Sequence, residues 1–174
     1  TDSCDKCVNC KRISTGTAPD VHWISLESGK KFIGINDIKE LQYASSLKPV
    51  ESNYKIFIIQ NADRLSEEAS NCLLKTLEEP PMSTLIILIT NSLDFLLETI
   101  VSRCQIIKFL NLPKDTIKTF LRTSYNIDED ALEWYTHVSN GSIGEAVKLM
   151  NANMFNKNET LINNLFNLKA RDNF

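Results

Sequence analysis

Apolar positions follow one pattern in the first two thirds of the chain and another in the rest. Two continuous apolar runs, Ile56–Ile59 and Leu85–Ile89, have the length of buried β-strands. Between them, Ser66–Glu78 has helical spacing, starts with a capping serine and acidic residues, and stops before Pro80-Pro81. A strand, a crossover helix and a second strand form a βαβ unit, which predicts a parallel sheet covered on both faces.

Elements on either side of this unit extend the same pattern. Val21–Leu26 predicts a further strand, and Asn36–Leu47 predicts a helix that precedes the central strand. Leu93–Val101 predicts a short helix, and a third apolar run, Ile106–Phe109, predicts another strand.

Beyond this run the spacing is helical, and no strand is predicted. Helices are expected to open at Lys114 or Asp115, after Asp128 and after Ser142. Leucines in the tail are spaced for one more helix. The fold class is therefore α/β followed by an all-helical part, with a first domain over residues 1–110 and a second over 111–174.

Composition changes this picture little. Hydrophobic residues make up 43% of the 174 residues and charged residues 24%, which is typical of a soluble globular protein. The formal net charge of −3 argues against an autonomous DNA-binding domain, which usually has a basic face. No apolar run approaches the ~20 residues that cross a bilayer, and no signal peptide is present, so we expect a cytoplasmic protein.

Three of the five cysteines lie together near the start of the chain. Cys4, Cys7 and Cys10 have C-x2-C-x2-C spacing, which in a cytosolic protein indicates metal binding rather than disulfides. Structural zinc takes four tetrahedral ligands, and only three are here. A ferredoxin-type cluster would need its fourth cysteine at Ser14, and His22 lies in a β-type run and is given little weight. The remaining two cysteines are expected to be buried structural thiols.

The segment 71–81 has the sequence NCLLKTLEEPP, and it is followed by an apolar strand and by Ser102-Arg103-Cys104. These two motifs at this spacing closely resemble bacterial clamp-loader subunits, the AAA+ proteins of the DNA polymerase III complex. The resemblance runs from Cys4 to about Met150. It implies a AAA+, P-loop NTPase-like core that lacks its N-terminal part, followed by a small helical lid. A chain that starts with threonine is then expected to be a fragment.

The resemblance also directs attention to positions that serve nucleotide chemistry in the family. ATP-hydrolysing relatives end the central strand with Asp-Glu, whereas this chain has Gln60-Asn61, and neutral amides neither hold magnesium as anions do nor act as bases. Gly144 stands where those relatives have an arginine. No G-x-x-x-x-G-K-[ST] loop is present, so no bound ATP is expected. Thr90-Asn91, at the next strand end, are expected to be turn residues rather than a phosphate sensor.

The family's zinc module carries one further cysteine upstream, so zinc is expected in the intact protein, with the fourth ligand before Thr1. The resemblance implies a non-catalytic subunit of the delta-prime type that supplies Arg103 in trans, as an arginine finger, to a neighbouring ATPase subunit. Its implied partners are gamma/tau ATPase subunits and the delta subunit, and through the complex the sliding clamp and primed DNA, without a membrane. The alternatives are an ATP-hydrolysing gamma/tau-type subunit and a cysteine-rich nucleic-acid-binding module.

Overall fold

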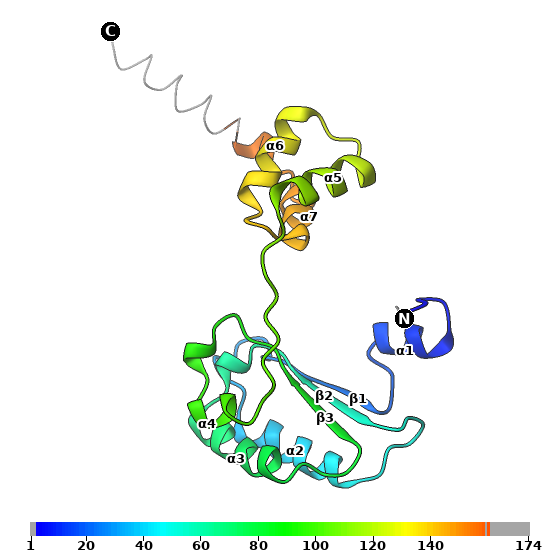
Figure 1. Ribbon diagram of the computed structural model, residues 1–174, viewed down its shortest axis with the longest axis vertical. Helices are drawn as coiled ribbons and strands as arrows, with labels where there is room; N and C mark the ends of the chain where they lie inside the picture. Colours follow the sequence, from blue (N-terminus) through cyan, green and yellow to red (C-terminus); the bar gives the residue numbers. More distant parts are fainter. Residues whose placement is uncertain (1–2, 159, 161–174) are drawn as a thin grey trace. The chain divides into compact units, whose positions relative to one another are not determined.

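The computed structural model describes residues 3–158 and 160. The chain divides into two compact units, Thr1–Ile106 and Ile107–Phe174 (Figure 1). The first unit combines a parallel sheet with helices, and the second is helical in its described part, which confirms the predicted fold class. The assignment of the two parts to a AAA+ core and a lid stays a prediction.

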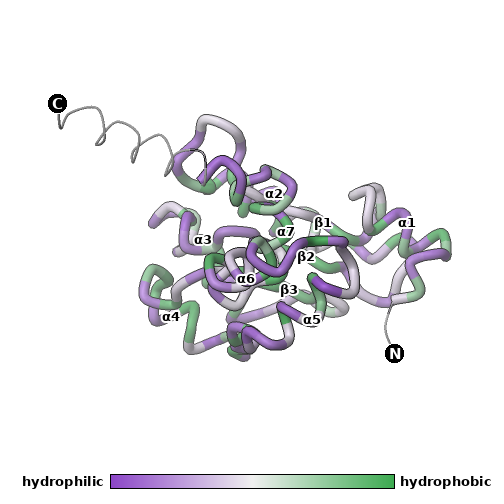
Figure 2. The backbone as a smooth tube through the Cα atoms, turned by 90° about the horizontal axis from the view of Figure 1, so that it is seen from above, coloured by the Kyte–Doolittle hydropathy of each residue, from purple (hydrophilic) through white to green (hydrophobic). Residues whose placement is uncertain are grey.

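Three parallel strands form one sheet in the order β1-β2-β3. They are β1 (Val21–Ile24), β2 (Lys55–Ile59) and β3 (Thr84–Leu88). The central and third strands consist almost entirely of apolar residues (Figure 2). The strands therefore lie where the apolar runs predict them, although β1 ends two residues earlier than expected.

Two helices cover the same face of this sheet (Figure 1). Helix α2 (Ile35–Ser46) connects β1 to β2, and helix α3 (Glu67–Glu78) connects β2 to β3. Because crossovers between parallel strands are right-handed and the strand order is sequential, both helices fall on one side. The buried residues of the resulting core are Ile33, Ile38, Leu41, Phe57, Ile59, Ala62, Ala69, Leu73 and Ile100.

The opposite face of the sheet is open in the described residues, so the prediction of two covered faces is wrong for this part of the chain. Trp23 is 46% exposed, Leu85 48% and Ile87 39%. These side chains alternate along the strands with the ones that face α2 and α3. A helix on the second face requires a crossover running in the opposite direction along the sheet, and neither described crossover does so.

The predicted strand at Ile106–Phe109 is also wrong. The segment has no strand partner among the described residues, and Ile107 is 72% exposed and Phe109 93%. An apolar run becomes a strand only when a neighbour pairs with its backbone N–H and C=O groups. Apolar content alone therefore overpredicts strands.

The predicted Leu93–Val101 helix is two short helices, because Leu96 and Leu97 between them have extended backbone. Ile100 is completely buried and fixes the second of them in the core. The short helices of the first unit are α1 (Val8–Ser14), η1 (Ala62–Arg64), η2 (Leu93–Phe95) and α4 (Glu98–Val101).

The second unit contains helices α5 (Lys114–Ser124), α6 (Glu129–Val138) and α7 (Ile143–Asn151), close to their predicted places. Gly141 separates α6 from α7 with φ +84°, and a Cβ there would lie 2.4 Å from Cβ of Asn111, so only glycine fits. The leucines predicted to form a further helix in the tail lie outside the described residues. The buried hydrophobic residues of this unit are Ile117, Leu121, Ala131, Leu132, Tyr135 and Ala146.

Candidate functional site

The start of α1 brings Cys4, Cys7 and Cys10 together. Cys7 is the N-cap residue, and its Sγ accepts a hydrogen bond from the backbone N–H of Cys10 at 3.4 Å. The Sγ atoms of Cys4 and Cys10 are 3.8 Å apart, and all three sulfurs lie within 4.8 Å of one another. Tetrahedral zinc with Zn–S bonds of about 2.3 Å separates its sulfur ligands by about 3.8 Å. The three thiols can therefore occupy three corners of a metal site.

One of these thiols loses its proton readily near neutral pH. Hydrogen bonds from the backbone of Lys6 and Cys7 lower the pKa of Cys4 to about 7, whereas the hydrogen bond with the Cys7 side chain raises the pKa of Cys10. Thiolates are the form of cysteine that binds metals. No further His, Cys, Asp or Glu within residues 3–158 joins the group.

Arg103 follows the end of α4, and its guanidinium contacts three neighbours. Nη2 lies 2.7 Å from Oε1 of Glu78, the last residue of α3. Nη1 donates to the carbonyl oxygen of Thr99 at 3.0 Å and to Oγ of Ser102 at 3.3 Å. The Arg103 side chain remains 36% exposed. The fold thus joins the two motifs of the sequence through one ion pair, which the sequence analysis did not anticipate.

Gln60 and Asn61 lie at the carboxyl end of β2, and both are exposed. The backbone N–H of Gln60 still donates to the carbonyl oxygen of Ile24 at 2.8 Å, so the sheet extends to this point. Asn61 has φ +55°, a left-handed conformation that asparagine adopts more easily than most residues. These two positions carry amides and offer no carboxylate to a metal or a water molecule.

Thr90 follows β3 and holds a turn. Its hydroxyl lies 2.7 Å from the carbonyl oxygen of Ser92 and accepts from the Ser92 N–H at 3.2 Å. The same hydroxyl is 3.2 Å from Oδ1 of Asp63, whose side chain is only 15% exposed. Sequence reasoning missed Asp63, because a single polar residue in a connecting loop carries no periodic or motif signal. The turn role that the sequence analysis expects for Thr90 is therefore confirmed.

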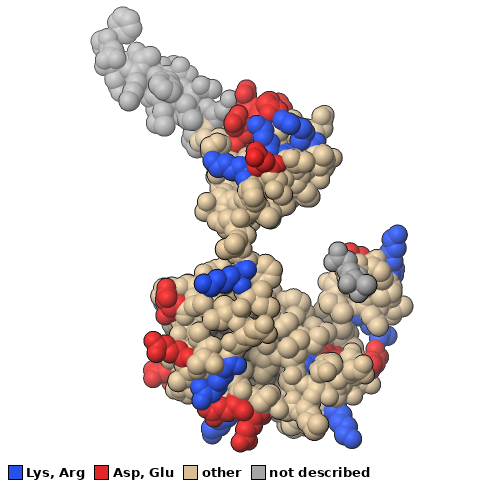
Figure 3. Space-filling model, viewed as in Figure 1, with Lys and Arg blue, Asp and Glu red and all other residues tan. Residues whose placement is uncertain are grey.

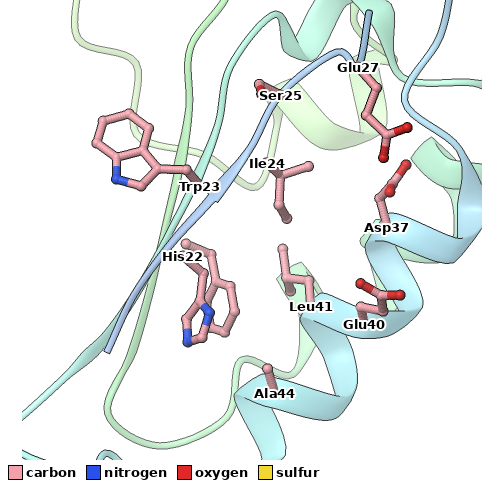
Figure 4. Close-up of a pocket in the computed structure, with 10 residues that line it drawn as sticks. His22, Trp23, Ile24, Ser25, Glu27, Asp37, Glu40, Leu41 and Ala44 are labelled. Carbon is pink, nitrogen blue, oxygen red and sulfur yellow. The ribbon is translucent and has the colours of Figure 1, made fainter. Parts of the chain in front are cut away.

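An open pocket of about 420 Å³ lies between β1 and α2, and three carboxylates, of Glu27, Asp37 and Glu40, line it (Figure 4). Glu27 and Asp37 point toward one another in this view. Oε2 of Glu27 lies 2.8 Å from Nζ of Lys30, and Oδ2 of Asp37 accepts a hydrogen bond from the backbone N–H of Gly34 at 2.9 Å. Two of the three carboxylates therefore already serve local structure.

His22 also lines this pocket and packs as an aromatic side chain. Its ring stacks on Phe57 with the centroids 4.8 Å apart and the planes at 12°. Burial and the charge of Lys55 lower the pKa of His22, so the imidazole is neutral at pH 7. His22 is thus a packing residue, and it is not part of the cysteine group.

Charged side chains are mixed in sign on the face of each unit that Figure 3 shows, without a continuous basic surface. In the second unit, Glu129 lies 2.8 Å from Arg122 and 3.2 Å from Lys118. Hydrogen bonds from these two cations lower the pKa of Glu129. This face therefore lacks the charge pattern of an autonomous nucleic-acid-binding surface. No helix in the described part of the chain is both long and apolar enough to span a membrane.

The family model that matches this chain and two of its curated relatives all concern DNA polymerase III subunits. A family model described as "DNA polymerase III, delta subunit" matches residues 1–113. DNA polymerase III subunit delta' of Bacillus subtilis (strain 168) is 34% identical over 167 residues, which cover 95% of this chain and 49% of that protein. DNA polymerase III subunit gamma of Buchnera aphidicola (subsp. Acyrthosiphon pisum) is 32% identical over 154 residues, covering 86% and 42%. The chain thus spans about half the length of the curated relatives it matches, or less.

Solved structures lead to the same fold. A DNA polymerase III gamma subunit-related protein of Thermotoga maritima has a TM-score of 0.60 at 30% identity, covering 76% of this chain and 43% of its own. The Thermotoga maritima RuvB Holliday junction branch migration motor has a TM-score of 0.57 at 18% identity, covering 80% and 47%, and this likeness concerns the fold alone. The fold is that of AAA+ proteins, and the chain belongs to the family of DNA polymerase III clamp-loader subunits.

Proposed function

We propose that this chain belongs to a delta-prime-type subunit, which supplies Arg103 in trans to the nucleotide site of a neighbouring ATPase subunit. The observation that carries the proposal is the Arg103 side chain, which is 36% exposed and whose guanidinium contacts neighbours on two helices. A guanidinium is always charged and matches phosphate oxygens with paired N–H donors. From an exposed position it can stabilise the charge that develops during phosphoryl transfer on a partner.

The end of β2 favours a non-hydrolysing subunit over the gamma/tau type. Sequence identity does not separate the two, because delta' and gamma relatives match at 34% and 32%. The amides of Gln60 and Asn61 cannot replace a magnesium-binding carboxylate or a general base. Gly144, in the first turn of α7, offers no side chain to a nucleotide. In this proposal the subunit works with gamma/tau and delta subunits to load a sliding clamp onto primed DNA.

Isolated full-length protein is expected to show no ATP turnover above a blank, because the end of β2 lacks catalytic carboxylates. The same protein is expected to raise the turnover that clamp and primed DNA stimulate when it is added to ATPase and delta subunits. A phosphate-release assay measures both quantities, with the gamma/tau subunit alone as the positive control. Turnover by the isolated protein at the level of that control would favour the gamma/tau alternative.

We also propose that zinc is the ion that the cysteine triad holds. Thiolates are soft ligands that suit zinc, and the sulfur separation of 3.8 Å fits a tetrahedral site. The triad would supply three of the four positions and hold the start of α1 in place. The proposed role is structural, because the triad lies at the N-cap of α1 and a bound ion would fix the start of that helix.

Protein purified from zinc-containing medium is expected to carry about one zinc ion per chain. Cys7→Ser is expected to lose most of this zinc, because it removes a central thiolate of the triad. Elemental analysis after gel filtration measures the content. Cys72→Ser is the matched control, since the Sγ of Cys72 donates to Oε1 of Gln42 at 3.4 Å and lies outside the triad. Equal zinc content in parent and Cys7→Ser would rule the triad out as the site.

A further inference from the structure

The ion pair between Arg103 and Glu78 links two elements that the core holds rigidly. Glu78 ends α3, and that helix is anchored by Leu73, which is 0% exposed. Arg103 follows α4, which is anchored by Ile100, also 0% exposed. Both backbones are therefore fixed, and the distance of 2.7 Å between Nη2 and Oε1 depends on the tertiary fold rather than on helical spacing.

We propose that Glu78 is a positioning residue that orients the Arg103 guanidinium toward the nucleotide of the neighbouring subunit. The proposal rests on the proposed function of Arg103 and deepens it. Glu78 holds one terminal nitrogen, while Thr99 and Ser102 hold the other. Acceptors on both nitrogens fix the plane of the guanidinium and its rotamer.

This arrangement leaves part of the guanidinium free for a ligand. An arginine has five N–H donors, and within the described part of the chain three contacts are present, to Glu78, Thr99 and Ser102. The two donors that remain are the number that a bidentate contact with phosphate requires. Because the Arg103 side chain is 36% exposed and Glu78 is 49% exposed, the pair lies at the surface, where another subunit can reach it.

Pre-orientation is useful because a free arginine side chain populates many rotamers and loses that freedom when it engages phosphate. An ion pair that selects one rotamer in advance lowers this cost. Catalysis in trans is sensitive to the placement of the charged group, so loss of the acceptor is expected to slow turnover on the order of tenfold. Removal of the guanidinium itself is expected to cost more.

The test uses full-length protein in a reconstituted clamp loader, with ATP turnover measured in the presence of clamp and primed DNA. Glu78→Ala is expected to lower the Arg103-dependent part of turnover about tenfold, mainly in kcat. Glu78→Gln keeps an acceptor oxygen and is expected to retain most of the activity. Glu79→Ala is the matched control, because the neighbouring Glu79 forms no ion pair among the described residues, and it is expected to leave turnover unchanged.

A double variant separates positioning from a general structural effect. In an Arg103→Ala background, Glu78→Ala is expected to cause no further loss, because there is no guanidinium left to orient. Additive losses would overturn the positioning role and leave Glu78 a structural residue. If Glu78→Ala fails to fold, Glu78→Met replaces it in both backgrounds, because methionine suits a helix and has a similar length but offers no carboxylate to Arg103, and the same loss is expected.

The outcomes also distinguish this inference from the proposed function. If Arg103→Ala lowers turnover while Glu78→Ala does not, the arginine finger stands and the positioning role is overturned. If Arg103→Ala leaves turnover unchanged, the arginine finger is overturned, and the role of Glu78 falls with it.

Discussion

Arg103→Ala is expected to lower ATP turnover by about 10³-fold at the one interface that receives this arginine. The reason is that the partner's site loses the only charge that this subunit is proposed to supply to the transferred phosphoryl group. In the assembled clamp loader the loss is partial, because the other interfaces continue to hydrolyse ATP. Steady-state phosphate release, together with the rate of clamp loading on primed DNA, measures both effects.

Arg12 offers a matched control for this variant. Its Nη1 lies 2.7 Å from Oε2 of Glu51, and the two side chains are 44% and 51% exposed, close to the values of the Arg103 pair. Arg12→Ala therefore removes the same charge and a similar surface ion pair, and it is expected to leave turnover unchanged. A surface pair contributes at most about 1 kcal/mol, so both variants are expected to fold normally.

Arg103→Lys separates the effect of the positive charge from that of the planar guanidinium. Lysine keeps the positive charge but lacks the planar fork that makes paired contacts to phosphate oxygens. We expect it to restore only part of the activity. Full activity of Arg103→Ala in turnover and in clamp loading would show that Arg103 has a structural role.

The sequence predicted well those features that depend on local chemistry. Helix α3 spans Glu67–Glu78, its N-cap Ser66 accepts from the Ala69 N–H at 3.2 Å, and the two apolar runs beside it are strands. The cysteine triad was predicted for the same reason, because x2 spacing keeps three thiols within one short turn. Such features can be predicted without information about segments that are distant in the sequence.

The sequence-based predictions were incomplete or wrong for features that depend on tertiary contacts. The ion pair of Arg103 with Glu78 requires the packing of α4 beside α3, which periodicity does not reveal. The open face at Trp23 and Ile87 follows from strand order, and the sequence alone did not give that order. Ile106–Phe109 has the composition of a strand but lacks a partner among the described residues. Strand pairing depends on a second segment, so the composition of one segment does not predict it.

Asp20→Ala is expected to lower the free energy of unfolding of the first unit by about 3 kcal/mol. Asp20 is 1% exposed and precedes β1. Its carboxylate accepts three backbone N–H groups of the loop before β2, from Val50 at 2.7 Å and from Glu51 and Ser52 at 2.8 Å. Hydrogen bonds to an ionised acceptor are stronger than neutral ones, and three of them hold this loop against the sheet.

The same carboxylate makes stability depend on pH. Burial alone would raise the pKa of Asp20, but the backbone hydrogen bonds outweigh it and lower the pKa below its usual value. The folded state therefore holds the ionised form more strongly than the unfolded chain does, where the pKa is about 3.9. The stabilisation is complete above that value and is lost as the pH falls through the lower folded-state pKa. Asp20→Asn is expected to remove this dependence and to cost less than Asp20→Ala at pH 7.

Urea unfolding followed by tryptophan fluorescence tests these expectations. The chain has two tryptophans, and a Trp134→Phe background leaves Trp23 as a reporter of the first unit. Asp37→Ala is the graded comparison, because Asp37 accepts one backbone N–H, from Gly34 at 2.9 Å, and is expected to cost about 1 kcal/mol. If Asp20→Ala costs no more than Asp37→Ala, the three hydrogen bonds do not hold the loop. If Asp20→Asn retains the acid sensitivity of the parent protein, another carboxylate is responsible for it.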